Sequence, residues 1–544
     1  MILEALGLLL AAQAQAAAPE KCSIEGRVLR AGSGEPIRKV QLTLFRDINR
    51  ASNSNFAVTD DSGHFSFTGL DPGRYQLSAD RNGYVRQQYG QRGQARMGAP
   101  LVLERGQAVR DIVFRLVPAA ILTGRVVDDE GEPVSYVRVE LFRYGYVQGR
   151  RQRMPAGGAS TNDLGEYRIF SLAPGRYFLS ATWASTGFMG SGSGLVAVTT
   201  GPNPTELTYA PTYFPGTADA TQASPIQIAP GAELRGIDLR LLKIPTVRIR
   251  GKVLNAVTGR PGRGIMVGLL TRNDPYMNRN FSAVEADGSF EIRGVTPGSY
   301  ELNANWAEGN QRYFASQPVE VANSPVEGIQ LVIAPGVEIS GRLQVEGQAD
   351  LSSTEFRVSL QATENRPMFG GGTSLVKNDG SFSIPNVNPG NYRVSFFGGG
   401  GAEELYLKSA RMGDADVLDI DLDIRPGQAA AQLELVASSK SARVEGSVTD
   451  DQGKPLSGVQ VVLVPDSSRR SITRLFKNIA TDQQGRFTLR GIAPGEYKLF
   501  AFDDLEFGAQ YDPDFLKQHE EKGKTLSLRE SSQASVTLKL KPGS

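Results

Sequence analysis

GHFSFTGLDPGRY, residues 63–75, is one of five copies of a single pattern in a chain of 544 residues. In every copy an aromatic residue follows the first Gly by two positions, and Pro-Gly-x-Tyr begins nine positions after that Gly. The other copies are GEYRIFSLAPGRY, GSFEIRGVTPGSY, GSFSIPNVNPGNY and GRFTLRGIAPGEY, which begin at Gly165, Gly288, Gly380 and Gly485. A pattern that recurs with constant internal spacing indicates one structural unit used five times.

Each copy alternates between apolar and polar residues, which predicts two β-strands joined by a turn. In the first copy Phe65 and Phe67 fall on one face of the first strand, and Tyr75 falls on one face of the second. Pro72-Gly73 predicts a type II turn, in which the Gly takes a positive φ. The Tyr is amphipathic, so we expect it to bury its ring and bond its hydroxyl back to the corner backbone.

Every unit begins with another alternating strand that carries one Gly, and it ends with a closing strand. We expect these glycines where a neighbouring backbone passes close or where the strand bulges. They are Gly26, Gly124, Gly251, Gly341 and Gly446. Only a few residues separate one unit from the next, which predicts a semi-rigid rod of five domains.

The shared order of features is a strand with Gly, then Gly-x-Pro, V-x-V-x-L, D-x-G-x-F and L-x-P-G-x-Y-x-L, although the fourth copy lacks Gly-x-Pro. This order resembles the carboxypeptidase regulatory-like domain family and is similar to collagen-adhesin B-type repeats. The resemblance implies an all-β chain of five tandem Ig-like or transthyretin-like, seven-stranded β-sandwiches. The expected sandwiches are residues 23–118, 119–245 with a long loop insertion, 246–335, 336–438 and 439–544. Function does not follow from such a fold.

The charge balance and the targeting signals limit which partners and which location can be expected. The chain has 59 Lys and Arg residues and 58 Asp and Glu residues, so its charge does not favour binding to nucleic acid or a polybasic contact with a membrane. Residues 1–18 are typical of an export signal, although Glu4 and the lack of a basic residue depart from one; a disordered Ala-rich tail is the alternative. No later apolar stretch reaches the ~20 residues of a membrane span. We therefore expect a secreted or cell-envelope protein without a transmembrane span in its mature chain.

Few residues suggest chemistry. His64 and His519 are the two histidines, and neither has a partner at metal-ligand spacing. Cys22 is the single cysteine, so no intramolecular disulfide is expected. Acidic turns such as Asp60-Asp61-Ser62-Gly63 favour hairpin turns over calcium sites. No residue pair stands out for glycoside hydrolysis among the acidic residues. The sequence predicts no enzyme, no cofactor and no metal.

The candidate ligand-binding residues are aromatic and lie where the copies differ. Trp183 and Trp306 each follow the Pro of their own Pro-Gly by nine positions, where the other copies carry Arg81, Gly398 and Asp503. These tryptophans either stack on a sugar or partner protein or cover their own cores. The long excursion of the second unit, roughly residues 185–230, contains Tyr209, Tyr213 and Phe214. It is either a binding loop or a brace between domains.

Taken together, these features predict an exported, non-enzymatic, monomeric scaffold that binds a glycan or a cell-surface protein. The alternative is a carbohydrate-binding accessory protein that works with a separate polysaccharide- or peptide-processing enzyme.

Overall fold

The computed structural model describes residues 20–46, 54–93, 98–147, 150–183, 197–198, 206–260, 264–272, 279–347, 355–363, 371–398, 402–428 and 431–540. The expected export signal, residues 1–18, lies outside the described residues. Within this part of the chain the structure is built from strands, with the single α-helix α1 (Pro513–His519) and several short 3-10 turns. The protein is an all-β tandem array of β-sandwiches, as the sequence predicts.

The strands group into five sandwiches, here numbered 1 to 5 in chain order. Sandwich 1 contains β1 (Cys22–Arg30), β2 (Gln41–Arg46), β3 (Ser54–Val58), β4 (His64–Leu70), β5 (Gly73–Asp80), β6 (Gln87–Gln88), β7 (Leu101–Leu103) and β8 (Ala108–Leu116). Sandwich 2 contains β9 (Ala120–Val127), β10 (Val137–Val147), β11 (Arg150–Ser160), β12 (Glu166–Leu172), β13 (Gly175–Trp183), β14 (Ala197–Val198), β15 (Glu206–Tyr209), β16 (Thr212–Tyr213), β17 (Ile226–Ile228), β18 (Glu233–Leu234), β19 (Leu239–Arg240) and β20 (Lys243–Pro245). Sandwich 3 contains β21 (Val247–Asn255), β22 (Met266–Thr271), β23 (Arg279–Ala283), β24 (Ser289–Val295), β25 (Gly298–Glu308), β26 (Gln311–Val321) and β27 (Val326–Pro335).

Sandwich 4 contains β28 (Val337–Glu346), β29 (Phe356–Ala362), β30 (Gly372–Leu375), β31 (Ser381–Val387), β32 (Gly390–Gly398), β33 (Tyr406–Met412), β34 (Ala415–Asp416), β35 (Leu422–Ile424) and β36 (Ala431–Ser438). Sandwich 5 contains β37 (Ala442–Thr449), β38 (Gln460–Pro465), β39 (Lys477–Ala480), β40 (Arg486–Ile492), β41 (Gly495–Phe502), β42 (Lys524–Leu528) and β43 (Gln533–Lys539). It also carries α1 and the 3-10 turns η4 (Thr473–Leu475) and η5 (Ala509–Tyr511).

All five sandwiches share one topology. The first strand of each lies between the signature strand, which is antiparallel to it, and the closing strand, which is parallel to it; in sandwich 1 the order is β4-β1-β8. The opposing sheet is built on the order β3-β2-β5 and its equivalents β11-β10-β13, β23-β22-β25, β30-β29-β32 and β39-β38-β41. In sandwich 3 the long strand β26 pairs with both β25 and β27, so the two sheets run into one another.

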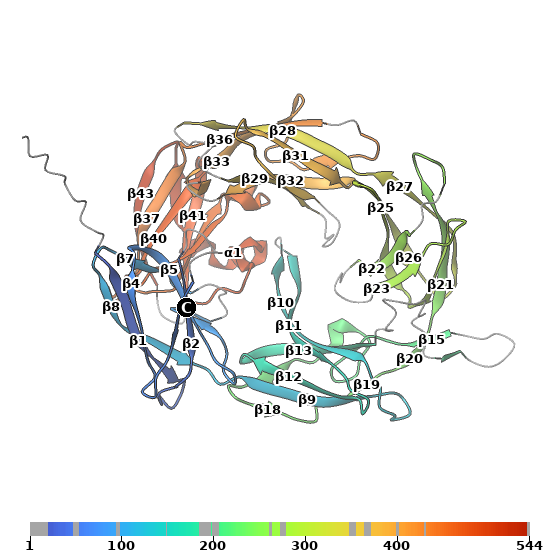
Figure 1. Ribbon diagram of the computed structural model, residues 1–544, viewed down its shortest axis with the longest axis horizontal. Coiled ribbons are helices and arrows are strands. Elements are labelled where there is room, and N and C mark those ends of the chain that lie inside the picture. The colour runs from blue at the N-terminus through green and yellow to red at the C-terminus, as the bar shows by residue number, and fades with distance from the viewer. Residues whose placement is uncertain are drawn as a thin grey trace, which may run out of the picture.

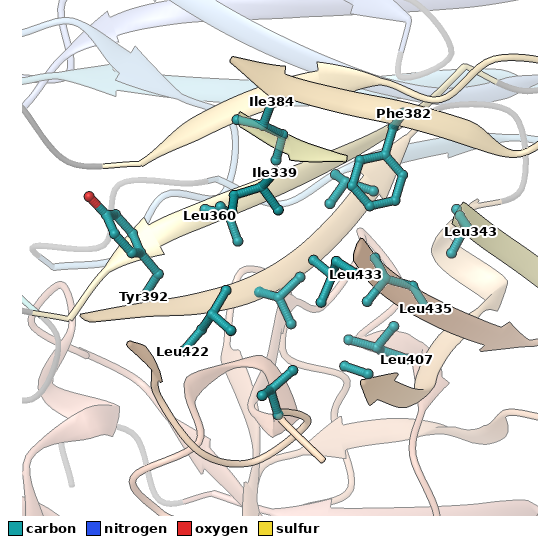
Figure 2. Packing of buried hydrophobic residues seen from close by; sticks show 14 of the residues in the cluster. Ile339, Leu343, Leu360, Phe382, Ile384, Tyr392, Leu407, Leu422, Leu433 and Leu435 are labelled. Carbon is teal, nitrogen blue, oxygen red and sulfur yellow. The ribbon is translucent and has the colours of Figure 1, made fainter. Parts of the chain in front are cut away.

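Each sandwich has its own hydrophobic core between its two sheets. In sandwich 4, Figure 2 shows Ile339 and Phe382 from one sheet facing Leu360 and Tyr392 from the other. All four side chains are at most 3% exposed. Burying such a side chain stabilises the fold by about 1.5–3 kcal/mol. The apolar residues of each strand alternate with polar ones, so they all fall on the face that is buried in the core.

The signature tyrosine is a corner residue in every sandwich, as predicted. Tyr75, for example, donates its hydroxyl to the carbonyl oxygen of Asp71 at 2.7 Å. The equivalent bonds join Tyr177 to Ala173, Tyr300 to Thr296, Tyr392 to Asn388 and Tyr497 to Ala493. Each ring is buried while its hydroxyl satisfies a carbonyl four residues earlier, so the motif fixes the corner between two strands.

The glycine of each first strand is required by a close approach, which confirms the prediction. A Cβ on Gly26 would overlap the carbonyl oxygen of Ile112 on the parallel strand β8. The same conflict would arise between Gly124 and Ile237, Gly251 and Ile329, Gly341 and Leu433, and Gly446 and Val536.

The predicted type II turn at Pro-Gly is wrong in detail. Gly73 and its equivalents have positive φ, but the values lie between +151° and +158° instead of near +80°, because each Gly already begins the next strand. The left-handed residue of the corner lies four positions earlier, where the chain carries Gly69, Ser171, Gly294, Asn386 and Gly491.

The five sandwiches form a ring and not the predicted rod. Figure 1 shows them following one another around a circle, with sandwich 1 returning to the side of sandwich 5. Arg92 of sandwich 1 forms an ion pair with Asp503 of sandwich 5 and donates to the carbonyl of Ser457. Gln483 of sandwich 5 makes two hydrogen bonds to the backbone of Val102 on β7. The short seams between sandwiches predict a semi-rigid rod. A short seam can equally fix one angle between neighbouring sandwiches, and the same angle at every seam produces a ring.

Candidate functional site

The same sheet of every sandwich lies on the inner side of the ring. In Figure 1 the sheets that contain β1, β9, β21, β28 and β37 lie on the outside, and those that contain β5, β13, β25, β32 and β41 lie toward the centre. One face of each inner sheet packs on the sandwich core, and its other face points toward the inside of the ring. We call this second face the inner face.

In sandwich 5 the inner face is covered by the chain itself. Phe500 and Phe502 of β41 point away from the core of the sandwich and form a second buried cluster with Leu516 of α1. The ring of Phe515 on α1 lies 5.5 Å from that of Phe502. Helix α1 begins because the Asp512 side chain accepts hydrogen bonds from the first-turn backbone. A short amphipathic helix therefore seals this sheet.

In sandwiches 1, 3 and 4 the inner face carries exposed aromatic residues. Phe397 of β32 occupies the position of Phe502, eight residues after the signature Pro, but is 51% exposed where Phe502 is 6% exposed. Phe56 of β3 and Phe281 of β23 each lie seven residues before the signature Gly and are 62% and 52% exposed. Phe56 pairs across the sheet with Thr43, between the core residues Leu42 and Leu44 of β2, so it points away from the core.

In sandwich 2 the inner face is an aromatic layer capped by arginines. Phe142 of β10 stacks on Phe178 of β13 at 5.6 Å. The guanidinium of Arg153 lies 5.1 Å from the centre of the Phe142 ring and donates to the hydroxyl of Tyr213 at 2.9 Å. Cation–π contacts of this kind stabilise a half-buried aromatic surface by about 0.5–2 kcal/mol each.

The hairpin β10–β11 of sandwich 2 is longer than its equivalents and crosses the inner side of the ring (Figure 1). At its tip the backbone amide of Tyr146 donates to the carbonyl of Phe507 in sandwich 5 at 3.3 Å. The Tyr146 ring packs on the cluster that α1 forms. Burial raises the pKa of Tyr146, and its hydrogen bond with Asp512 raises it further. The hairpin thus holds sandwich 2 against sandwich 5.

The five aromatic residues singled out by sequence fall in two separate sandwiches. Trp183 is the last residue of β13, and its ring meets that of Tyr209 edge to face at 5.9 Å. Both rings, together with that of Phe214, are partly buried and pack on the core of sandwich 2. Tyr213 is 5% exposed and belongs to the aromatic layer of the inner face. Trp306 lies on the core of sandwich 3 against Tyr313, with ring centres 4.8 Å apart.

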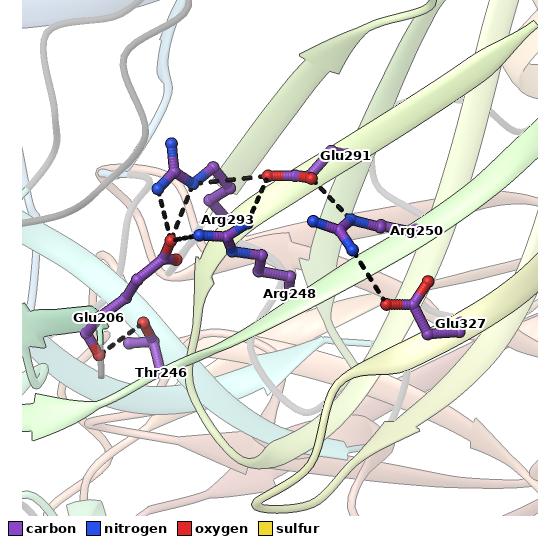
Figure 3. A network of polar contacts seen from close by, with 7 residues as sticks. All are labelled: Glu206, Thr246, Arg248, Arg250, Glu291, Arg293 and Glu327. Atoms are coloured by element: carbon purple, nitrogen blue, oxygen red, sulfur yellow. Dashed lines mark hydrogen bonds and ion pairs between the residues drawn. The ribbon is translucent and has the colours of Figure 1, made fainter. Parts of the chain in front are cut away.

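The described part of the second unit's long excursion braces two sandwiches. Glu206 of β15 is 6% exposed and accepts hydrogen bonds from Arg248 and Arg293 of sandwich 3 (Figure 3). Its backbone carbonyl also accepts from Thr246. Burial acts to raise the pKa of Glu206, but the bonds from Arg293 and Arg248 outweigh it and lower the pKa. Residues 184–196 and 199–205 of this excursion lie outside the described part.

The acidic turns use their carboxylates locally. Asp60 accepts hydrogen bonds from the backbone amides of Ser62 and His64 within its own turn. Asp128 and Asp450 cap their turns in the same manner. Within the described ranges there is no group of three or more His, Cys, Asp or Glu residues able to hold a metal ion.

The exposed aromatics of the inner face were missed by reasoning from the sequence. Comparing the copies position by position would have found them, because Phe56 and Phe281 share one offset from the signature Gly, and Phe397 and Phe502 share another from the signature Pro. The strand alternation alone does not separate an exposed face from one that a later helix covers.

Residues 23–116 and 443–539 match the model of the carboxypeptidase regulatory-like domain. Sandwiches 1 and 5 are therefore similar to this domain. Over 486 residues the chain is 23% identical to mouse BOS complex subunit NOMO1, a match that covers 88% of this chain and 35% of the relative. Human BOS complex subunit NOMO3 is 22% identical over 488 residues, with 88% and 35% covered. The chain spans about one third of the length of these relatives.

Solved structures also match parts of this chain, with low TM-scores. A streptococcal ancillary pilin matches 58% of this chain and 99% of its own, with 13% identity and a TM-score of 0.19. Two B repeat units of the collagen-binding protein of Staphylococcus aureus match 78% of this chain and 100% of their own, with 10% identity and a TM-score of 0.14. None of the helices in the described residues is long and apolar enough to cross a membrane.

Proposed function

We propose that the chain is an exported, non-catalytic scaffold that holds a protein partner on the inner faces of its ring. The observation that carries the proposal is the difference between Phe502, covered by α1, and the equivalent Phe397, which is half exposed. The partner supplies to sandwiches 1, 3 and 4 what α1 supplies to sandwich 5, an amphipathic segment with aromatic or aliphatic residues along one side.

Two further points favour a protein over a glycan. The relatives NOMO1 and NOMO3 are named as subunits of a complex, which favours a protein as the partner of this chain. The exposed side chains of the inner face, such as Phe56, Phe281 and Leu375, are apolar, and apolar surface gains most from burial against another apolar surface. Residues 1–18 support export.

Site-specific photo-cross-linking tests this proposal. A photoreactive phenylalanine is placed at Phe56 or Phe281 on the inner faces and, as matched controls, at Val113 or Val332 on outer sheets, which are 45% and 51% exposed. Cross-linking in the cells that produce the protein should join one and the same protein to both inner positions and not to the outer ones. Cross-linking only from the outer positions, or to unrelated proteins at each position, would contradict the proposal.

A second candidate function is that of a carbohydrate-binding accessory protein, and the Trp183–Tyr209 pair favours it. Both rings are partly exposed at a strand end, where an aromatic edge can stack on a sugar. Glycan-array binding by the whole chain that disappears in Trp183→Ala, with Trp306→Ala as the comparison, would support this function. Binding to no glycan leaves the protein-holding scaffold as the preferred function.

A further inference from the structure

A cavity of about 280 Å³ lies between sandwiches 4 and 5. Its apolar wall comes from both sides, with Phe396 of β32 and Leu405 from sandwich 4 and Leu475 of η4 from sandwich 5. A volume near 300 Å³ is at the small end of the range for ligand pockets, so the cavity suits a ligand with one ring or a short chain. At this boundary Arg490 of sandwich 5 forms an ion pair with Glu404 of sandwich 4.

The polar lining of this cavity is cationic and incompletely bonded. The Nη2 atom of Arg474 is held by Asp419 and by the carbonyl of Leu418, but its buried Nε has no hydrogen-bond partner. The ammonium of Lys477 makes no hydrogen bond or ion pair with any residue that the structure describes. The buried hydroxyl of Ser395, which also lines the cavity, has no partner either.

The ammonium of Lys477 is not paired by the walls of the cavity. Asp419, which does not line the cavity, is engaged by Arg474 and by Arg469, and the one carboxylate of the lining, Glu403, is exposed and forms no ion pair with Lys477. Burial lowers the pKa of Lys477, and the nearby charge of Arg474 lowers it further. Burying an uncompensated cation is unfavourable, so a site of this kind gains free energy when an anion enters it.

We propose that this cavity is a binding site for a small organic carboxylate with an aromatic or short aliphatic body. The carboxylate accepts from Lys477, from the Nε of Arg474 and from the hydroxyl of Ser395, and the body packs on Phe396, Leu405 and Leu475. The site lies at the junction between two sandwiches and shares Phe397 with the inner face of sandwich 4, but none of the groups proposed to hold the carboxylate belongs to the exposed aromatics of the inner faces. Its occupant would lock sandwich 4 to sandwich 5.

Fluorine NMR on the full chain tests the site with 4-fluorophenylacetate as the probe and 4-fluorophenylacetamide as its neutral twin. The acid should bind in the millimolar range or tighter, and the amide at least about tenfold more weakly, because a charge-assisted hydrogen bond contributes more than a neutral one. Lys477→Met should weaken binding of the acid by at least about tenfold. Lys454→Met, which changes an exposed lysine of the same sandwich, should leave it unchanged.

Three outcomes would overturn the proposal: no binding of the acid at 20 mM (about the highest useful concentration), equal binding of acid and amide, or full binding by Lys477→Met. Misfolding does not confuse the result, because methionine keeps the length of the side chain and removes a buried charge. Ser395→Ala provides a second variant. It should weaken binding of the acid by about threefold, because one hydrogen bond to the carboxylate is lost. Wild-type affinity in Ser395→Ala would remove the hydroxyl from the site and count against the geometry proposed.

Discussion

Removing the contacts between sandwiches 1 and 5 should open the ring. The double variant Arg92→Ala, Gln483→Ala deletes one ion pair to Asp503 and three hydrogen bonds that involve the backbone of Ser457 or Val102. At about 0.5–1.5 kcal/mol for each interaction, closure loses about 2–6 kcal/mol. The ratio of closed to open molecules then falls by a factor of about 30 to 20 000, at about 1.4 kcal/mol for each factor of ten.

Small-angle X-ray scattering distinguishes the two states. Five sandwiches of about 35 Å arranged in a ring have a radius of gyration of about 30 Å, whereas a straight rod of the same units has about 50 Å. The wild type should give the smaller value and the double variant a clearly larger one. Adding Tyr146→Ala removes the ring of the hairpin tip from sandwich 5 and should increase the value again.

The control is Arg105→Ala, which removes an exposed cation from sandwich 1 without touching the closure. This variant should keep the radius of gyration of the wild type. A wild-type radius near that of a rod would refute the ring, and an unchanged radius in the triple variant would refute the assignment of closure to these contacts.

Further predictions concern single residues. Tyr497→Phe leaves the carbonyl of Ala493 without its 2.8 Å hydrogen bond and should destabilise sandwich 5 by about 1–2 kcal/mol, seen as faster hydrogen exchange in β41; unchanged exchange would contradict the corner role. Ser171→Gly should stabilise sandwich 2 by up to about 1 kcal/mol, because Ser171 has φ +57°; a lower melting temperature would argue against strain there. Because the pKa of Glu206 is lowered in the fold, its bonds to sandwich 3 stabilise the junction above the ordinary pKa of 4.5 and lose that contribution as the pH falls through the lowered value. Glu206→Gln should remove this acid-dependent loosening of the junction, as measured by hydrogen exchange against pH.

Local features could be predicted from the sequence because they depend on residues close together in the chain. The corner bond of Tyr75 and the close approach at Gly26 follow from short-range geometry, and both were found in all five sandwiches. The sequence left open whether the long excursion of the second unit is a binding loop or a brace between domains. The brace at Glu206 could not be chosen in advance, because the sequence does not show which arginines an acidic loop residue will contact. The type II turn was wrong because the Gly of Pro-Gly belongs to the following strand.

The ring could not be predicted, because it depends on contacts between residues about 380 to 410 positions apart, such as Gln483 with Val102 and Arg92 with Asp503. The side chains that make these contacts, those of Gln483, Arg92 and Asp503, are polar, and none belongs to the repeated pattern. A small constant bend at each seam is enough to bring the fifth unit back to the first, and such a bend is set by packing between neighbours rather than by linker length.

The ring gives the unrepeated residues a common location. Helix α1, the arginine-capped layer around Phe142 and the exposed Phe56 and Phe281 occur at different points of the chain, yet all belong to the inner faces or cover one of them. In a rod these faces would point in directions set by each seam, whereas in a ring they converge on one side. Several weak apolar contacts then act on one partner at high effective concentration. Opening the ring should therefore weaken partner binding more than the loss of any single exposed Phe.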